Sequence, residues 1–481
     1  MKRVGPASLL TLTLLLSACG APDLGARPQL HAPPALESAA SLAAANPAAQ
    51  WPREAWWTAY GDPQLDALVA EALADSPDVA AAQARIRQAR GVAEQAGAAT
   101  LPSLGGAGQA GLVKQSYNNG IPAAFVPRGW KSNGTLALSG DFDLDLWGKN
   151  RKALAAATSE ALAAEADARQ AELLLSSNVV SSYFDLARLV ARQKALAEAV
   201  KAREAMVSLT WARVQQGLDN EAPLRRAEAE AAAARRALSA NAEQELLRRH
   251  AIAALLGKGP DRGLAIASPA IDAIPASELP SDAGIALAGR RPDIVAARLR
   301  AEAASSRIDA AKAAFLPDIS LSGLIGLTSL GLSNLFDTGS TYGNVGGAIS
   351  LPIFQGGALK GEFRQARGAY DAAVANYNAT VAGALQDVAD ALASRNAARN
   401  QAVEARAARD SARAAHALAE KRFKGGLVSY LDTLDAQTAA LDAREAAIDA
   451  HFRSLALEVA LKRALGGGFA DGSFEKAPND E

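Results

Sequence analysis

Three aspartates stand at alternate positions in the sequence, Asp141, Asp143 and Asp145, and carboxylates are side chains that bind calcium in proteins. A calcium-binding loop also needs glycine and further oxygen ligands on a tight turn, whereas Phe142 and Leu144 separate these acids. Alternation of acidic and large apolar residues is instead typical of a β-strand with one face in water. We therefore expect the aspartates to lie on the water-facing side of a strand.

The other residues that could support catalysis stand apart from one another. The four histidines have no carboxylate or cysteine pattern around them, and no zinc-protease, phosphate-loop or serine-nucleophile motif occurs. Glycines cluster at 105–111 and 465–468, but neither cluster has the strand, turn and helix context of a phosphate-binding loop. The sequence therefore predicts no catalytic residue, no metal site and no cofactor.

The one cysteine, Cys19, excludes an intrachain disulfide and a thiolate zinc site. It follows a basic amino terminus, a short apolar run and the residues Leu-Ser-Ala, which is the order of a secretory signal, here 1–18. The segment resembles the lipobox of bacterial lipoproteins, which implies a covalent lipid on Cys19, and Gly20 in place of aspartate favours the outer membrane. The alternative is that Cys19 is merely a small residue near an ordinary cleavage site.

The composition of the 481 residues limits the function and favours helices. The chain has 50 Lys and Arg against 51 Asp and Glu, a net charge of −1, which argues against a nucleic-acid partner. Apolar residues make up 49% and aromatic residues 5%, and the dominance of alanine suggests long, closely packed helices. After the signal, no stretch reaches 18 continuous apolar residues, so any passage through a membrane would use strands.

A repeated order of landmarks divides the chain into two similar halves. Pro77 and Pro102 recur 215 positions later, and the glycine turn at 216–218 recurs at 425–427. We therefore expect two internal repeats in place of several unrelated domains. The predicted order is a signal peptide 1–18, a lipidated Pro/Ala-rich tether 19–62, the repeats 63–265 and 266–468, and a polar tail 469–481.

Both repeats are predicted to contain the same elements. A helix of about 22 residues precedes two strands, which a loop rich in Gly, Asn and Pro connects; a very long proline-free helix, a glycine turn and a second long helix follow. At about 1.5 Å per residue the longest helix would span roughly 100 Å, so it must pair with others along its length, as in a coiled coil. The expected helices are 78–99, 150–216 and 221–256, and then 293–315, 358–424 and 429–465.

The predicted strands have one apolar and one polar face. Trp130 and Trp147 bracket the clearest stretch, as aromatic residues do at membrane surfaces. Between 135 and 146, the large apolar residues occupy the even positions, and the polar residues, including the three aspartates, the odd ones. The stretches 319–328 and 344–353 alternate similarly. A half-buried sheet in a soluble protein is the alternative, but the secretory signal favours a lipid-facing apolar side.

Four strands are too few to close a barrel, and an open sheet edge in lipid would leave backbone groups without hydrogen bonds. Several chains must therefore contribute strands. Twelve strands from three chains would close a barrel with a wide lumen, which the three aspartates would face. The residues alone do not choose three chains over two or four.

The sequence resembles the TolC-like outer-membrane factor family, and in particular its NodT-like branch of efflux lipoproteins. The resemblance implies a mixed α and β fold: a homotrimer shares a 12-stranded β-barrel in the outer membrane, continued by a long α-helical coiled-coil barrel through the periplasm. The matching motifs run in order from about 51 to 468: Trp56-Trp57, Asp62-Pro63-Gln64-Leu65-Asp66, Asp143-Leu-Asp-Leu-Trp147-Gly148-Lys149, Arg290-Arg-Pro-Asp-Ile294, Ala313-Ala-Phe-Leu-Pro317, Leu351-Pro-Ile-Phe-Gln-Gly-Gly357, Ser429-Tyr-Leu-Asp-Thr-Leu-Asp-Ala-Gln437 and Ala464-Leu-Gly-Gly-Gly468.

The family resemblance also implies a passive exit duct and no enzyme activity. An inner-membrane pump of the resistance-nodulation-division (RND) type and a periplasmic adaptor protein would deliver small molecules, such as drugs and toxic compounds. The same fold could instead export proteins by type I secretion, or metal ions. The alternative of another class is a non-conducting structural lipoprotein that spans the periplasm.

The two glycine turns are the expected contact with the adaptor. In the family such turns form the periplasmic tip, and the matching residues are Gly217, Leu218, Gly426 and Leu427. The simpler interpretation is that glycine is needed there to reverse the chain. Both interpretations can hold for one turn.

The resemblance further implies a gate just beyond the second turn. Family members narrow the tunnel with a ring of leucines and a ring of aspartates, and the matching residues are Leu431 and Asp435. Residues four apart share one helix face, and three Asp435 carboxylates around one axis would repel each other unless they were hydrated or bound to cations. The alternative is that Asp435 pairs with an arginine of a neighbouring helix. Asp432 is predicted to point to another face.

Overall fold

The computed structural model describes residues 21–32, 36–38, 40–42, 49–269, 271 and 278–473. The chain forms two compact units, and α4 and α9, whose bounds follow below, contribute residues to both. The sheet unit takes its described residues from Met1–Gln29, Ile86–Ala164 and Ala297–Tyr377. The helical unit takes its described residues from Leu30–Arg85, Glu165–Ala296 and Asn378–Glu481.

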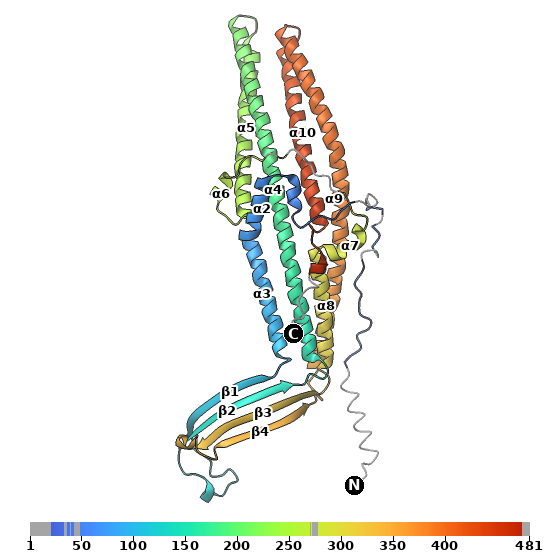
Figure 1. Ribbon diagram of the computed structural model, residues 1–481. Helices are drawn as coiled ribbons and strands as arrows, with labels where there is room; N and C mark the ends of the chain where they lie inside the picture. The colour runs from blue at the N-terminus through green and yellow to red at the C-terminus, as the bar shows by residue number, and fades with distance from the viewer. Residues whose placement is uncertain are drawn as a thin grey trace. The chain divides into compact units, whose positions relative to one another are not determined.

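The two internal repeats are confirmed by the order and lengths of the elements (Figure 1). Corresponding helices have 22, 67 and 35 residues in both repeats, and their bounds agree with the predicted ones to within two residues. The first repeat contains α3 (Pro77–Ala98), β1 (Ser103–Val113), β2 (Lys131–Asp143), α4 (Lys149–Gln215) and α5 (Glu221–Leu255). The second contains α8 (Pro292–Ala313), β3 (Asp318–Leu330), β4 (Thr341–Ser350), α9 (Ala358–Lys424) and α10 (Tyr430–Ala464).

Several short elements before, within and after the repeats were not predicted from sequence patterns. The helix α2 (Pro63–Asp75) begins where the Asp62 side chain accepts hydrogen bonds from the N–H groups of Gln64 and Leu65. The other short elements are η3 (Trp56–Tyr60), η4 (Ala123–Phe125), α6 (Pro260–Leu264), α7 (Ala283–Arg290), η5 (Leu332–Asn334) and η6 (Asp471–Ser473).

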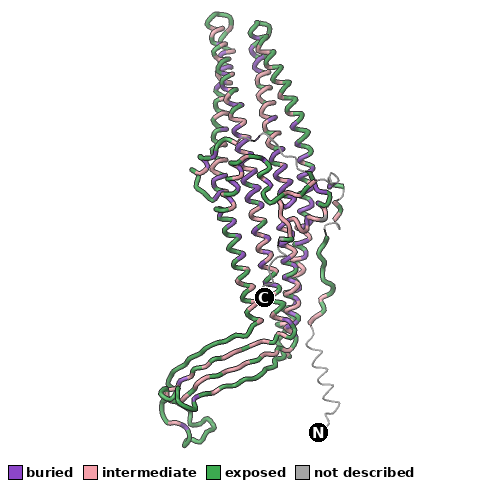
Figure 2. The backbone as a smooth tube through the Cα atoms, viewed as in Figure 1, coloured by how far each residue is buried: buried purple, intermediate pink, exposed green. Residues whose placement is uncertain are grey.

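The four strands of the sheet unit form one antiparallel sheet in the order β1-β2-β3-β4. Leu136 of β2 lies opposite Gly108 of β1 and Leu327 of β3, so the alternating apolar residues of β2 and β3 share one face of the sheet. On the other face, the hydroxyl groups of Thr135 and Thr328 are 3.2 Å apart. Figure 2 shows that most of the sheet is exposed or half-buried in the single chain.

The main core of the helical unit forms where η3 and α2 pack against α4, α5 and α10. Trp56 and Tyr60 are buried there, and the Tyr60 ring lies edge-on to Phe184 with 4.8 Å between the ring centres. The Tyr183 hydroxyl donates a hydrogen bond of 2.6 Å to the Asp62 carboxylate. Many large apolar side chains of the helical unit therefore gather near this segment.

The helices α4 and α10 are joined along their length by ion pairs. Arg188 pairs with Asp449 at 3.3 Å and Arg192 with Glu445 at 2.6 Å. Pairs as exposed as these contribute at most about 1 kcal/mol each, so they set the register of the helices more than they stabilise them. Among the helices that the structure describes, none combines the length and apolar character needed to cross a membrane.

Candidate functional site

The face of the sheet that was predicted to be apolar is exposed in the single chain. Val345 is 90% exposed and Leu104 is 88% exposed, although both are large aliphatic residues in regular strands. An apolar surface of this extent marks contact with lipid or another protein. The exposed aliphatic residues on this face are Leu104, Leu112, Leu136, Leu138, Leu321, Ile325, Val345 and Ile349.

The opposite face of the sheet has mostly polar or small side chains, with Leu324 and Tyr342 as larger residues among them. Asp141 lies opposite Ser103 of β1 and Ser322 of β3, and Asp143 lies opposite Ser320. These two acids are therefore on the polar face, as the alternation predicted. The outer strands of the sheet, β1 and β4, each pair with a single described strand, so each has one edge with free backbone groups.

Asp145 does not share the environment of the other two aspartates, which corrects the prediction of three equivalent strand acids. The strand β2 ends at Asp143, and Asp145 lies in the following turn at a positive φ of 42°. Its side chain is 8% exposed and accepts hydrogen bonds of 2.9 Å from the backbone N–H groups of Asn150 and Arg151. The carboxylate therefore caps the first turn of α4, because unpaired N–H groups at a helix start attract an anion.

We predict that Asp145→Ala lowers the free energy of unfolding by about 2 kcal/mol at neutral pH, the upper range for loss of a helix cap. Burial alone would raise the pKa of Asp145, but hydrogen bonds from Arg151 and Asn150 outweigh it, and the pKa is lowered. The stabilisation is thus present above the unfolded-state pKa of about 3.9 and lost as the pH falls through the folded-state value.

Thermal unfolding of both proteins from pH 7 to pH 3 checks this prediction. The difference between wild type and Asp145→Ala should be constant down to about pH 5 and shrink below about pH 4. Asp145→Asn is the matched control, since asparagine tolerates positive φ and keeps one acceptor oxygen, and it should cost less. A difference that does not change with pH would contradict a charged cap.

The two predicted tips have the same backbone geometry. Gly217 and Gly426 have φ values of 69° and 71°, which glycine adopts without strain. The N–H of Leu218 donates to the carbonyl of Arg213, and the N–H of Leu427 to that of Arg422, both at 2.9 Å. This pattern ends the long helices and turns the chain back.

The tips also present apolar side chains to solvent. Leu218 is 61% and Leu427 is 78% exposed. Beneath them, Phe423, Tyr430 and Leu434 form a small buried cluster that joins α9 and α10. The geometry accounts for the glycines as turn residues, and the exposed leucines are available to a partner.

Leu431 and Asp435 are exposed on one face of α10, close to its start. Asp432 instead caps this helix: its carboxylate accepts hydrogen bonds from the Ser429 N–H at 2.9 Å and hydroxyl at 2.7 Å. Asp435 has no hydrogen bond or ion pair with another described residue, so a pair with an arginine of the same chain is not seen. The structure thus separates the two aspartates in the way that their spacing suggested.

The described start of the predicted tether, residues 21–29, lies against α8 and α9 of the sheet unit. Leu24 joins an apolar cluster on these helices. Arg367 of α9 is 9% exposed and donates a hydrogen bond of 3.1 Å to the carbonyl oxygen of Gly25, and another to that of the next residue. This first part of the predicted tether, residues 21–29, is therefore a strap docked on the helices. Sequence composition does not reveal the buried arginine that holds it.

Two predictions concern covalent and metal chemistry. Cys19 lies outside the described residues, so its lipidation stays a prediction. Across the part of the chain that the structure describes, no three His, Cys, Asp or Glu side chains come close enough together to hold a metal ion.

Comparison with known sequences gives consistent relatives. The outer membrane efflux protein family matches residues 68–258 and 286–467. The fusaric acid resistance protein FusA of Burkholderia cepacia is 37% identical over 349 residues, which are 71% of this chain and 64% of FusA. The multidrug resistance outer membrane protein MdtP of Escherichia coli strain K12 is 28% identical over 487 residues, 98% of both chains.

Solved structures share the fold described above. The outer membrane protein VceC from Vibrio cholerae is 40% identical, with a TM-score of 0.82 over 87% of this chain and 100% of VceC. The outer-membrane channel OprN is 28% identical, with a TM-score of 0.83 over 94% of this chain and 99% of OprN. The mixed α and β fold with two repeats, four strands and long paired helices is thereby confirmed.

Proposed function

This chain belongs to the outer membrane efflux protein family, and from that membership we propose that three copies close their sheets into one 12-stranded barrel. Its family makes it an outer-membrane exit duct. The long helices of the three copies would continue the barrel as a tunnel through the periplasm. In this arrangement substrate passes by diffusion, and the chain carries out no catalysis.

The observation that carries this proposal is the exposed apolar face of the sheet, opposite a polar face and between two free edges. In lipid, every backbone polar group needs a partner within the protein, so the free edges of β1 and β4 would have to pair with neighbouring copies. Closure would turn the apolar residues outward to lipid, and Asp141 and Asp143 inward to water. Trp130 and Trp147, both more than half exposed, suit the two membrane surfaces.

The cargo we favour is small organic molecules. FusA is named for fusaric acid resistance and MdtP for multidrug resistance, and both names describe protection from small toxic compounds. We propose that an RND-type inner-membrane pump selects the cargo and that a periplasmic adaptor contacts the tips at Leu218 and Leu427. A lipid on Cys19 would hold the amino terminus at the outer membrane, which the mass of the Cys19 peptide tests.

We propose that Leu431 and Asp435 form the gate of this duct. Replacing both with alanine should raise single-channel conductance in planar bilayers severalfold, because it removes an apolar ring and a ring of like charges. Asp442→Ala is the matched control: it removes an exposed carboxylate two turns further along the same face of α10, and conductance should not change. Unchanged conductance in the double variant, or an equal rise in the control, would show that the gate lies elsewhere.

A further inference from the structure

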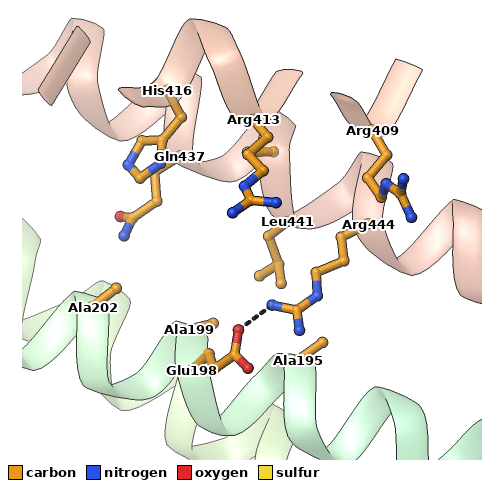
Figure 3. A pocket seen from close by; sticks show the side chains of 11 residues that line it. Ala195, Glu198, Ala199, Ala202, Arg409, Arg413, His416, Gln437, Leu441 and Arg444 are labelled. Atoms are coloured by element: carbon orange, nitrogen blue, oxygen red, sulfur yellow. Dashed lines mark hydrogen bonds and ion pairs between the residues drawn. The ribbon is translucent and has the colours of Figure 1, made fainter. Parts of the chain in front are cut away.

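A basic groove lies between α4, α9 and α10 in the helical unit (Figure 3). One part is a cavity of about 550 Å³, and a second cavity of about 620 Å³ adjoins it, with Glu198, Arg409 and Arg444 lining both. In Figure 3 the side chains of Arg413, His416 and Gln437 reach from α9 and α10 over the alanines of α4. We call the two cavities together the α4–α9–α10 groove.

The groove concentrates positive charge on a chain that is almost neutral. Four arginines and Lys194 line it, whereas Glu198 is the single acid among the described residues that do so. Arg444 is paired with Glu198, and Arg409 with Asp410. The remaining two arginines, at 406 and 413, form no hydrogen bond or ion pair with any residue that the structure describes. Their charge is available to an anionic ligand.

The connection between the repeats indicates which way the groove faces. Pro269 and Ile271 of this connection line the second cavity. If the helices of three copies enclose a duct, a segment that crosses them from one repeat to the next has to run over the outside of the tube. The groove therefore opens to the periplasm and not into the duct, a step that rests on the proposed function.

We propose that the α4–α9–α10 groove binds the carboxylate-bearing peptide stems of the cell-wall polymer, the anionic network that a periplasm-spanning duct has to cross. Arginine binds carboxylates through two parallel hydrogen bonds, and Arg406 and Arg413 are free to do so. Each cavity has the size of a site for a small ligand, between about 300 and 1,000 Å³. Gln437 and His416 add hydrogen-bonding groups suited to the amides and hydroxyls beside such carboxylates.

Co-sedimentation of the full-length protein in detergent with purified cell-wall sacculi tests the proposal. Wild type should pellet at low salt and be released as the salt concentration rises, since exposed charges are screened. The double variant Arg406→Glu/Arg413→Glu should bind at least about tenfold more weakly, because both free cations become repulsive. Sacculi whose stem carboxylates have been converted to neutral amides with a carbodiimide and ammonia keep their cross-links and should retain little wild-type protein.

Arg236→Glu is the matched control. Arg236 is an exposed arginine of α5 outside the groove, and reversing its charge should leave sedimentation unchanged. Equal sedimentation of the groove variant and wild type, or equal binding of wild type to amidated and untreated sacculi, would overturn the proposal. Binding of wild type to soluble polyglutamate but not to sacculi would also overturn it, in favour of an acidic protein partner. Single-channel conductance is measured on the same samples. A groove variant that still conducts but no longer pellets with sacculi shows that wall binding is lost while the duct remains intact.

Discussion

Gly466→Ala should prevent the chain from forming a stable helical unit, with a loss of about 4 kcal/mol or more in the free energy of unfolding. Gly466 has a φ of 82°, and a β-carbon at this position would collide with the carbonyl oxygen of Arg290. The obstacle is backbone at the junction of α7 and α8, so no side chain can rotate away. Gly468 is constrained in the same way, since a β-carbon there would collide with the backbone of Arg53.

The matched control for Gly466→Ala is Gly61→Ala. Gly61 has a φ of 68°, but nothing lies within 4 Å of the position that a β-carbon would occupy. This variant therefore isolates the strain of a left-handed backbone, about 1 to 2 kcal/mol. Thermal unfolding of both variants in detergent measures the difference. Similar midpoints for the two would mean that the close approach of Gly466 to the backbone of Arg290 does not support the fold.

Val345→Arg should impair insertion of the sheet into lipid by about 2 to 4 kcal/mol per chain, because arginine is costly on the lipid-facing side of a membrane strand. Val345 belongs to β4 and lies on the apolar face, opposite Gly323 of β3. Asn344 is the adjacent residue on the other face, opposite Leu324, so Asn344→Arg places the same charge where water is expected. Urea titrations of folding into lipid vesicles compare the two variants.

The two faces of the sheet predict opposite results for this pair. Asn344→Arg should fold with nearly the midpoint of wild type, whereas Val345→Arg should fold at lower urea concentrations or fail to insert. Equal losses for both arginines would contradict the assignment of one face to lipid and the other to water. A greater loss for Asn344→Arg would mean that the faces are assigned the wrong way round.

Much of the fold could be predicted because the two repeats reinforce each other. The prolines at 77 and 292 mark the starts of α3 and α8, and the absence of proline from α4 and α9 predicts their great length. Most of the strands were predictable because large apolar and polar residues alternate along much of their length. These are local patterns, which a single sequence displays.

The parts that could not be predicted depend on contacts between distant residues. Asp145 continues the alternating sequence pattern of β2, but the strand ends at Asp143. The carboxylate of Asp145 instead accepts a hydrogen bond from the backbone N–H of Arg151 at the start of α4. The strap is held by Arg367, more than 300 positions away. Gly466 stands in a glycine run for which the sequence indicates no contact, whereas the structure places it against the backbone of Arg290.

Cysteine cross-linking between β1 and β4 tests the central claim that copies of this chain close their sheets together. Ala107→Cys in β1 is combined in turn with Asn344→Cys, Gly346→Cys or Ala348→Cys in β4. Within one chain these strands are three strand spacings apart, roughly 14 Å, which is too far for a disulfide. Any cross-link therefore joins two copies.

We predict that at least one of these pairs, oxidised in the outer membrane, gives linked dimers and trimers in a denaturing gel, with a ladder that stops at three chains. A ladder that extends beyond three chains, or no linked species for any pair, would contradict a barrel shared by three copies.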